Sequence, residues 1–470
     1  MFFKIFIVFN IILIIIMAIF EIKQFKKFLF WSIIIAIFSI IGFLGYVIIG
    51  NELKFYTKKQ IKRKHKSLKS YLKTSNIEYN FNQSTNYNNI SSFIKKNCNC
   101  EVWNKNIIKT YYFGNDFLSD LLVDISLAKD SIHLEFFIFS DDATGQQIAT
   151  TLINKAKQGV NIKIIYDAFG SRKTKDIFWQ RLKENNIDVE AFLPPISKFP
   201  FLNFRINYRN HRKIAIIDGK IAYTGGINLR NDHMGLDKKL KPWRDTQIRI
   251  QGFGVYSLQD IFLNDWQFCT NKRLTKFQIK KYFPTINSTG NLDLQVISDG
   301  PDTDCNKIFH SYLKIIDNAK KYIFIQTPYF LINKQMETAL LNAIKRNVKV
   351  CIVIPRKPDK RLVYGASILN ISNMLKNNAS VYLYKGFIHS KILSTESVIS
   401  IGSCNFDYRS FFLNFESTCL CYNKSFITKN KSKIADDINN SILLTKKMYR
   451  KLKTNNIFFI LLFKCISKLL

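Results

Sequence analysis

Hydrophobic and polar positions divide the chain into an apolar start, a polar stretch and a long region of alternating strand and helix patterns. The runs over residues 1–20 and 28–50 each contain only two charged or polar side chains. Each run is long enough to cross a bilayer as a helix. We therefore predict two transmembrane helices within residues 1–50, followed by a basic juxtamembrane segment and irregular linker over residues 51–105.

The distribution of positive charge predicts an orientation for these helices. Nine lysine and arginine residues lie between residues 54 and 73, directly after the second run, whereas the connection between the runs carries three lysines. Positive residues collect on the cytoplasmic side of membrane spans. The pattern predicts a multi-pass protein of the cell membrane with its globular part in the cytoplasm.

The globular part shows one succession of elements twice. Each succession is a buried strand, an amphipathic helix and a second buried strand, over residues 131–139, 146–157 and 160–166 and again over 322–330, 336–346 and 348–354. Strand–helix–strand patterns without hairpin signals indicate parallel pairing and an α/β fold. Residues 152–165 and 340–353 are similar in sequence. We predict a tandem duplication, with repeat 1 over residues 106–285 and repeat 2 over residues 286–445.

The last segment, residues 446–470, combines a basic stretch with an apolar one too short to span a bilayer comfortably. It is predicted to form an interfacial helix lying along a membrane. A helix packed onto the domain is the alternative.

Composition narrows the classes of partner. The chain has 47% hydrophobic and 14% aromatic residues, which excludes a disordered protein, and a formal net charge of +36. Such charge suits an anionic partner, either nucleic acid or an acidic membrane leaflet, although a general drift toward lysine would produce it too. The nine cysteines have no spacing typical of a metal site and are expected to be free thiols.

Candidate chemistry lies in a hairpin over residues 207–228. Asp218-Gly219 is a tight-turn signal between two apolar strands. Alternation along a strand puts His211 and Lys213 on one face, and the returning strand brings Asn228 close to them. An imidazole, an ammonium group and a carboxamide would then converge on a site that attracts anions.

A second copy of this pattern makes a chance occurrence improbable. His389, Lys391, Glu396 and Asn405 follow each other in nearly the same order and spacing. A lone H-x-K pair carries little weight, whereas a duplicated set predicts a single site built from both repeats.

The two H-x-K-x4-acid motifs, each followed by G-[GS]-x-N, resemble those of the phospholipase D superfamily. Further segments resemble its bacterial cardiolipin synthases: S-I-H-L-E-F-F-I-F-S-D-D, N-Y-R-N-H-R-K-I-A-I-I-D-G-K, P-W-R-D-T, Q-T-P-Y-F, I-P-R-K-P-D and N-F-D-Y-R-S-F-F-L-N-F-E. The resemblance implies two phospholipase D-like repeats, with mixed sheets flanked by helices, related by a pseudo-twofold axis. It also implies a metal-independent transfer between two phosphatidylglycerol molecules that gives cardiolipin and glycerol.

The resemblance also implies roles for individual residues. The motif residues carried over as catalytic are His211, Lys213, Asp218, His389, Lys391 and Glu396. Asn228 and Asn405 are implied as phosphate ligands, and Asp245 and Glu416, which follow their histidines at similar distances, as carboxylates that orient the histidines. His211 is implied as the nucleophile that carries the phosphatidyl group, and His389 as the acid/base. No cofactor or metal is implied, and the expected partners are phosphatidylglycerol and anionic membrane lipids rather than nucleic acid.

Two positions depart from the family's pattern. Glu396 stands where the second motif usually has aspartate, and we expect it to brace the hairpin and to be tolerated. Gly365 stands where relatives often carry a large aromatic side chain, which would enlarge or loosen a substrate pocket.

Two other functions remain open from the sequence. A phosphodiesterase of the same fold would hydrolyse phospholipid or nucleic acid with the same residues, and a non-enzymatic tethered protein would bind acidic lipid through charge alone. Phosphatidylethanolamine or another alcohol could also replace the second phosphatidylglycerol. The oligomeric state is not indicated by the sequence.

Overall fold

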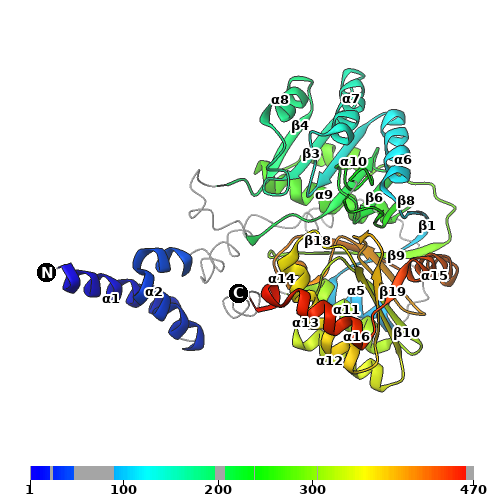
Figure 1. Cartoon of the computed structure of the whole chain (residues 1–470). Helices are drawn as coiled ribbons and strands as arrows, with labels where there is room; N and C mark the ends of the chain where they lie inside the picture. The colour runs from blue at the N-terminus through cyan, green and yellow to red at the C-terminus, as the bar shows by residue number, and fades with distance from the viewer. Residues whose placement is uncertain are drawn as a thin grey trace.

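A computed structural model describes residues 2–21, 25–46, 89–195, 207–237, 239–303 and 305–461 (Figure 1). Two apolar helices, α1 (Phe2–Glu21) and α2 (Phe25–Gly45), pack against each other at the start of the chain. Among the described residues, one helix, Phe28–Gly45, is long and apolar enough to cross a membrane, and Ile5–Ala18 is a shorter apolar helix. By length and composition the described residues thus offer one candidate membrane span, and the predicted pair is not confirmed.

The body of the protein is built on one mixed sheet of fifteen strands. The strands of repeat 1 are β1 (Val102–Tyr111), β2 (Ser131–Phe136), β3 (Asn161–Asp167), β4 (Asp188–Phe192), β5 (Lys213–Ile217), β6 (Ile221–Gly225), β7 (Trp243–Arg244) and β8 (Gln247–Gln251). Those of repeat 2 are β9 (Leu292–Asp299), β10 (Tyr322–Gln326), β11 (Phe330–Leu331), β12 (Lys349–Pro355), β13 (Ser380–Tyr384), β14 (Phe387–Ile388), β15 (Ile392–Ser394), β16 (Ile399–Gly402), β17 (Phe406–Asp407), β18 (Glu416–Cys421) and β19 (Ser441–Leu443). Strands β7 and β14, and β11 and β17, form two small separate ladders.

The order of the strands shows the duplication. From the central antiparallel pair β1 and β9, repeat 1 continues β8-β6-β5-β2-β3-β4, and repeat 2 continues β18-β16-β15-β10-β12-β13. Strand β2 pairs in parallel with β3, and β10 with β12, as the strand–helix–strand pattern predicts. The two halves therefore have the same topology and meet at β1 and β9.

Helices cover the sheet in each repeat (Figure 1). Before and within repeat 1 they are α5 (Asn89–Cys98), α6 (Gly114–Leu127), α7 (Ala143–Lys157), α8 (Asp176–Glu184), α9 (Gly254–Thr270) and α10 (Lys276–Tyr282). In repeat 2 they are α11 (Lys307–Asn318), α12 (Lys334–Lys345), α13 (Arg361–Lys376), α14 (Tyr408–Phe412), α15 (Lys424–Asn439) and α16 (Lys446–Asn455). Each repeat has its own apolar core, and a third core, which includes buried residues of α9 and α15, contains strands of both repeats.

The turn at Asp218-Gly219 forms as predicted. Both residues have positive φ, 52° and 63°, which is the conformation of a tight hairpin turn between twisted strands. Strand β5 pairs with β6 from Ile217↔Ile221 to Ile214↔Thr224. This pairing brings the chain back to the end of β5 at which His211 lies, so the residues after β6 come close to His211.

Two expectations about the flanking segments need correction. Residues 89–98, placed in the irregular linker, form helix α5, which packs on α11 through the buried Ile90 and Ile94. Apolar residues at this spacing find a partner on a helix far away in the sequence, which no local pattern reveals. Residues 51–88 of that linker lie outside the described residues. Residues 99–101 lead into β1, and residues 102–105, also placed in the linker, are its first four residues.

Gly365 does not line the one pocket described below. A side chain there would start 3.0 Å from Cβ of Phe459 and 3.3 Å from the backbone nitrogen of Ile460. The glycine therefore lets the segment after α16 lie directly on α13, in contrast to the enlarged substrate pocket expected from the sequence.

Candidate active site

The two motif histidines are each held by a carboxylate of the other repeat. Nδ1 of His211 lies 3.0 Å from Oε2 of Glu416, and Nδ1 of His389 lies 2.7 Å from Oδ2 of Asp245. The sequence suggested that each carboxylate serves the histidine it follows, but the structure pairs them crosswise. Each pairing leaves Nε2 of the ring available to a substrate.

Backbone contacts between the repeats produce this crossing. The N–H of His211 donates to the carbonyl of Phe415 at 2.9 Å, and the N–H of His389 donates to that of Arg244 at 2.7 Å. In the sequence, Phe415 directly precedes Glu416, and Arg244 directly precedes Asp245. Asn210 bridges Phe415 and Ile388 pairs with Arg244, both in parallel, so each histidine and its carboxylate come next in register. Each histidine and its carboxylate thus lie next to each other on two adjacent, parallel backbone segments.

Small residues make room for the carboxylates. A Cβ on Gly226 would lie 2.0 Å from Oδ1 of Asp245, so only glycine fits there. The corresponding residue of repeat 2 is Ser403, and its hydroxyl donates to Glu416. The G-[GS]-x-N motif therefore shapes the space around each carboxylate.

Both motif lysines are buried beside the histidines. Nζ of Lys213 donates to the carbonyl of His211 at 2.6 Å. Nζ of Lys391 donates to the carbonyl of His389 and lies 2.8 Å from Nδ1 of the same ring. Two ammonium groups and two imidazoles thus gather beside two carboxylates.

This crowding changes the proton affinities of the cluster. Burial, together with the neighbouring lysines, lowers the pKa of His211 to about 4 against the opposing pull of Glu416. Burial lowers the pKa of Lys213 to about 7 and of Lys391 to about 8. Burial and Lys391 hold the pKa of His389 well below its usual range.

The pKa values of the two carboxylates are lowered as well, but by their charged neighbours and against the effect of burial. Burial by itself raises the pKa of Asp245, but His389, Lys391 and His233 outweigh it and bring the pKa well below the ordinary value. For Glu416, burial is likewise outweighed, mainly by His211 and Lys213, so its pKa is lowered. Both carboxylates are therefore ionised at neutral pH.

The two asparagines flank this cluster, each a few residues after a motif strand. Oδ1 of Asn228 accepts the N–H of Ile138 at 3.2 Å, which turns the amide N–H groups of Asn228 inward. Asn405 is buried, and its Oδ1 has no hydrogen-bond partner. The structure therefore brings together His211, Lys213, Asn228, Asp245, His389, Lys391 and Glu416 from the predicted set.

Asp218 and Glu396 lie at the opposite ends of their hairpins. Oδ1 of Asp218 accepts the N–H groups of Asp130 and Ser131 at 2.7 and 2.9 Å. Glu396 accepts the N–H groups of Lys320 and Lys321 at 2.8 and 3.3 Å. Each carboxylate thus tethers the segment that leads into β2 or β10, and the structure does not bring either one to the histidines.

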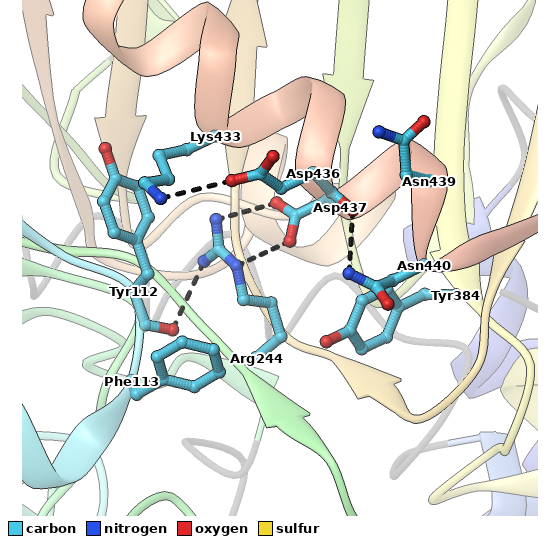
Figure 2. Close-up of a pocket in the computed structure, with 9 residues that line it drawn as sticks. All are labelled: Tyr112, Phe113, Arg244, Tyr384, Lys433, Asp436, Asp437, Asn439 and Asn440. Atoms are coloured by element: carbon cyan, nitrogen blue, oxygen red, sulfur yellow. Dashed lines mark hydrogen bonds and ion pairs between the residues drawn. The ribbon is translucent and has the colours of Figure 1, made fainter.

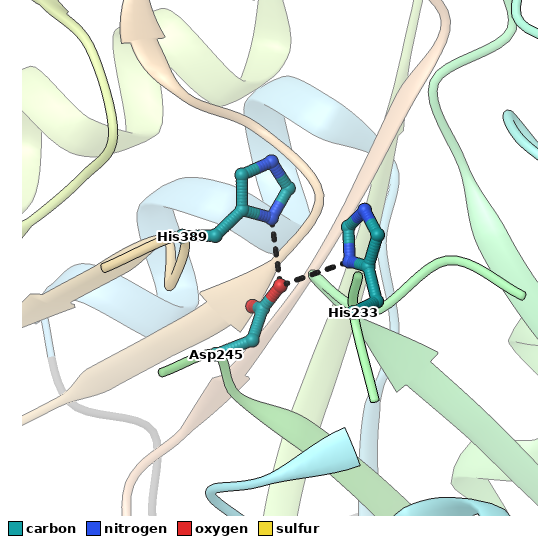
Figure 3. Close-up of side chains that lie close together, drawn as sticks. All are labelled: His233, Asp245 and His389. Atoms are coloured by element: carbon teal, nitrogen blue, oxygen red, sulfur yellow. Dashed lines mark hydrogen bonds and ion pairs between the residues drawn. The ribbon is translucent and has the colours of Figure 1, made fainter. Parts of the chain in front are cut away.

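A third histidine belongs to the cluster and was missed by the sequence analysis. His233 lies edge-on to His389, with ring centroids 4.9 Å apart, and its Nδ1 is 3.7 Å from Oδ2 of Asp245 (Figure 3). The only signal was its place five residues after Asn228 in N-L-R-N-D-H. His233, Asp245 and His389 are spaced so that a metal ion could bridge them, but the ammonium of Lys391 beside His389 disfavours a second cation.

A pocket of about 340 Å³ lies between the two repeats, beside Arg244 of the W-R-D segment (Figure 2). It is lined by Tyr112, Phe113, Arg244, Tyr384, Lys433, Asp436, Asp437, Asn439 and Asn440. Arg244 donates to both carboxylate oxygens of Asp437 at 2.9 and 2.8 Å and to Oγ of Ser390 at 3.1 Å. Arg244 thus binds two segments of repeat 2, at Asp437 and at Ser390. These bonds hold the neighbouring Asp245 against the segment that carries His389.

Comparison with known proteins agrees with this geometry. The family model described as cardiolipin synthase, PLD-like domain, matches residues 121–240 and 312–438, one segment in each repeat. The chain belongs to this family. A cardiolipin synthase of Listeria welshimeri is 35% identical over 431 residues, which cover 90% of this chain and 89% of the relative.

Other relatives and one solved structure extend the comparison. The major cardiolipin synthase of Bacillus subtilis strain 168 is 36% identical, covering 87% of this chain and 86% of its own length. Cardiolipin synthase 1 of Staphylococcus epidermidis is 37% identical, with 90% and 87% covered. The crystal structure of a phosphatidylserine synthase of Haemophilus influenzae superposes with a TM-score of 0.60 at 14% identity, covering 82% of this chain and 100% of the other, and shows a shared fold.

Proposed function

We propose that this chain is a cardiolipin synthase that transfers a phosphatidyl group from one phosphatidylglycerol to a second and releases glycerol. Its relatives carry that name, and the chain covers most of their length. The observation that carries the proposal is the pair of crossed contacts, His211 with Glu416 and His389 with Asp245. They turn two repeats into one site with two oriented imidazoles.

A phosphodiester transfer needs a nucleophile on one side of phosphorus and a proton donor on the other. His211 fits the nucleophile, because its low pKa keeps the ring neutral and Glu416 fixes Nδ1, which leaves the Nε2 lone pair for phosphorus. A P–N bond to His211 forms as the P–O bond to glycerol breaks, and His389 gives its proton to the departing oxygen. His389 then takes a proton from the hydroxyl of the second lipid, whose oxygen displaces His211.

The lysines and asparagines have the electrostatic role in this scheme. The phosphate carries a negative charge that resists attack, and Lys213, Lys391, Asn228 and Asn405 can donate hydrogen bonds to its non-bridging oxygens. A bound anion also offsets the charge of both lysines, which raises the proton affinity of His389 and allows it to act as an acid. In this scheme Asp218 and Glu396 support the hairpins and do not touch substrate.

The apolar and basic segments suit an enzyme of lipids in a membrane. In this proposal α1 and α2 both span the bilayer, with the repeats on the cytoplasmic side, where positive charge gathers. After the basic helix α16, Ile457, Phe458 and Leu461 are exposed while Ile460 is buried against the repeat 2 core. This segment would lie on the membrane surface, with its lysines toward anionic lipid and its apolar side chains toward the acyl chains.

Product analysis tests the proposal. Full-length enzyme reconstituted in phosphatidylglycerol vesicles, without added divalent metal, should produce cardiolipin and glycerol in equal amounts. His211→Ala and His389→Ala should each reduce the rate by at least a thousandfold. Accumulation of phosphatidic acid would indicate a hydrolase instead. Adding phosphatidylethanolamine tests the alternative acceptor, since a mixed lipid product would show that the second lipid need not be phosphatidylglycerol.

A further inference from the structure

His233 is buried between two residues of the proposed mechanism. The backbone N–H of Asn228 lies 3.2 Å from its Nδ1, and Nδ2 of Asn228 lies 3.1 Å from its Nε2. On the other side the ring faces Asp245, with Nδ1 3.7 Å from the carboxylate (Figure 3). Only 3% of His233 is exposed, so its ring stays among these groups.

Packing fixes the orientation of the His233 ring. The indole of Trp243 lies with its centroid 4.5 Å away at 52°, and the His389 ring stands at 88° to it. The backbone N–H of His233 donates to Oδ1 of Asp232. Packing between these two rings holds the imidazole with its two nitrogens toward Asn228.

The two repeats differ at this point. In repeat 2 the hydroxyl of Ser403 donates to Glu416, but the matching Gly226 cannot carry a side chain beside Asp245. In repeat 1 the polar neighbour comes from His233 instead, five residues after Asn228. The residue five after Asn405 is Ser410, whose Oγ has no hydrogen-bond partner. Among the described residues, His233 of repeat 1 thus lies between Asn228 and Asp245, whereas Ser410 of repeat 2 makes no such connection.

We propose that His233 is a positioning residue that fixes the carboxamide of Asn228 and the Asp245–His389 pair relative to each other. The inference rests on the proposed transfer reaction. In the tautomer with the ring proton on Nδ1, beside Asp245, Nε2 of His233 accepts one amide hydrogen of Asn228. With Oδ1 of Asn228 bound to the N–H of Ile138, the second amide hydrogen is left for the phosphate. Held in this way, Asn228 meets the oxygen that gains charge in the transition state without first having to reorient.

Kinetics of variants in phosphatidylglycerol vesicles test this role. His233→Phe keeps the ring and removes both nitrogens, and should lower kcat about 10- to 100-fold with KM nearly unchanged. His233→Gln, which can both donate and accept, should recover at least a third of the wild-type kcat. His310→Phe, a change of the exposed histidine on α11, is the matched control and should leave kcat unaltered.

A double-mutant cycle distinguishes positioning from general damage. In an Asn228→Ala background, His233→Phe should cost less than a fifth of the factor it costs in the wild type, because the group it positions is gone. If the two losses multiply, or if His233→Gln is as slow as His233→Phe at equal melting temperature, the inference is wrong. Should His233→Phe fold poorly, His233→Met replaces it in the same cycle. Wild-type enzyme that makes no cardiolipin would instead reject the proposed function.

Discussion

His211 and Glu416, 205 positions apart in the chain, lie with Nδ1 and Oε2 3.0 Å apart, and the carboxylate also accepts the hydroxyl of Ser403. Neither repeat on its own contains a complete histidine–carboxylate pair. This explains why the two halves share one continuous sheet and a common core. The pairing can form only if the halves are held in a fixed relation, and the strand pair β1 and β9 holds them.

Removing the charge of Glu416 should therefore act on the histidine of the other repeat. Glu416→Gln keeps the volume but can present an amide N–H to His211, which would favour the wrong tautomer. We expect turnover to fall about 10²- to 10⁴-fold, as for other oriented catalytic histidines. Formation of the covalent phosphatidyl-enzyme, trapped by denaturant at alkaline pH because a P–N bond to histidine hydrolyses in acid, should slow equally. Asp245→Asn should instead impair the steps assigned to His389; identical kinetics in both variants would contradict the division of roles.

Lys213 should lower stability while supporting activity. Its pKa falls from 10.5 to about 7 because of burial, so the folded protein binds a proton at this site less readily than the unfolded chain. Below pH 7 this costs the folded state on the order of 4 kcal/mol, and the cost disappears as pH rises from about 7 toward the ordinary lysine value. Lys213→Met should therefore abolish turnover yet raise the melting temperature at pH 6–7. A lower melting temperature would show that Lys213 is mainly structural.

The same shifts predict the pH dependence of catalysis. In the free enzyme Lys213 and Lys391 lose their protons near pH 7 and 8, so kcat/KM should decline as pH rises above about 7 and more steeply above about 8. Bound phosphate favours the protonated lysines, so the alkaline decline of kcat should lie at higher pH than that of kcat/KM. On the acid side, His211 with a pKa of about 4 keeps its lone pair down to roughly that pH. An acid decline centred near pH 6.5 would contradict the burial of this ring.

Asp218 and Glu396 provide a contrast to the catalytic set. At the entrance to a strand, Asp218 accepts three backbone N–H groups and Glu396 accepts two, which resembles the capping of a helix end in its effect. Glu396→Ala should lower the free energy of unfolding by about 1 kcal/mol while leaving turnover per folded enzyme within twofold. Glu396→Asp should change activity little. A loss of turnover beyond tenfold in Glu396→Ala, at unchanged melting temperature, would show that Glu396 has a catalytic role.

The sequence was sufficient for the duplication, the parallel strand–helix–strand units and the paired His-Lys-Asn motifs, because hydrophobic periodicity and spacing are local signals. It did not reveal which histidine meets Asp245, since that depends on how two halves with the same topology pack. Helix α5 was missed because the partner that buries Ile94 lies more than two hundred residues away. His233 was missed for a related reason: its role depends on contacts with Asn228 and His389 that only the folded chain makes.

Gly365 lets the C-terminal segment lie on α13. Any Cβ at this position would meet Phe459 at 3.0 Å, so Gly365→Phe should displace the segment and expose Ile460, now 1% exposed. Losing one buried isoleucine contact should cost about 1.5–3 kcal/mol, and amide exchange over residues 457–461 should rise to that of an open chain. Gly365→Ala is the matched control, because its single methyl group needs a shift of only a few tenths of an ångström. Equal protection of residues 457–461 in wild type and Gly365→Phe would show that this glycine has another reason to be there.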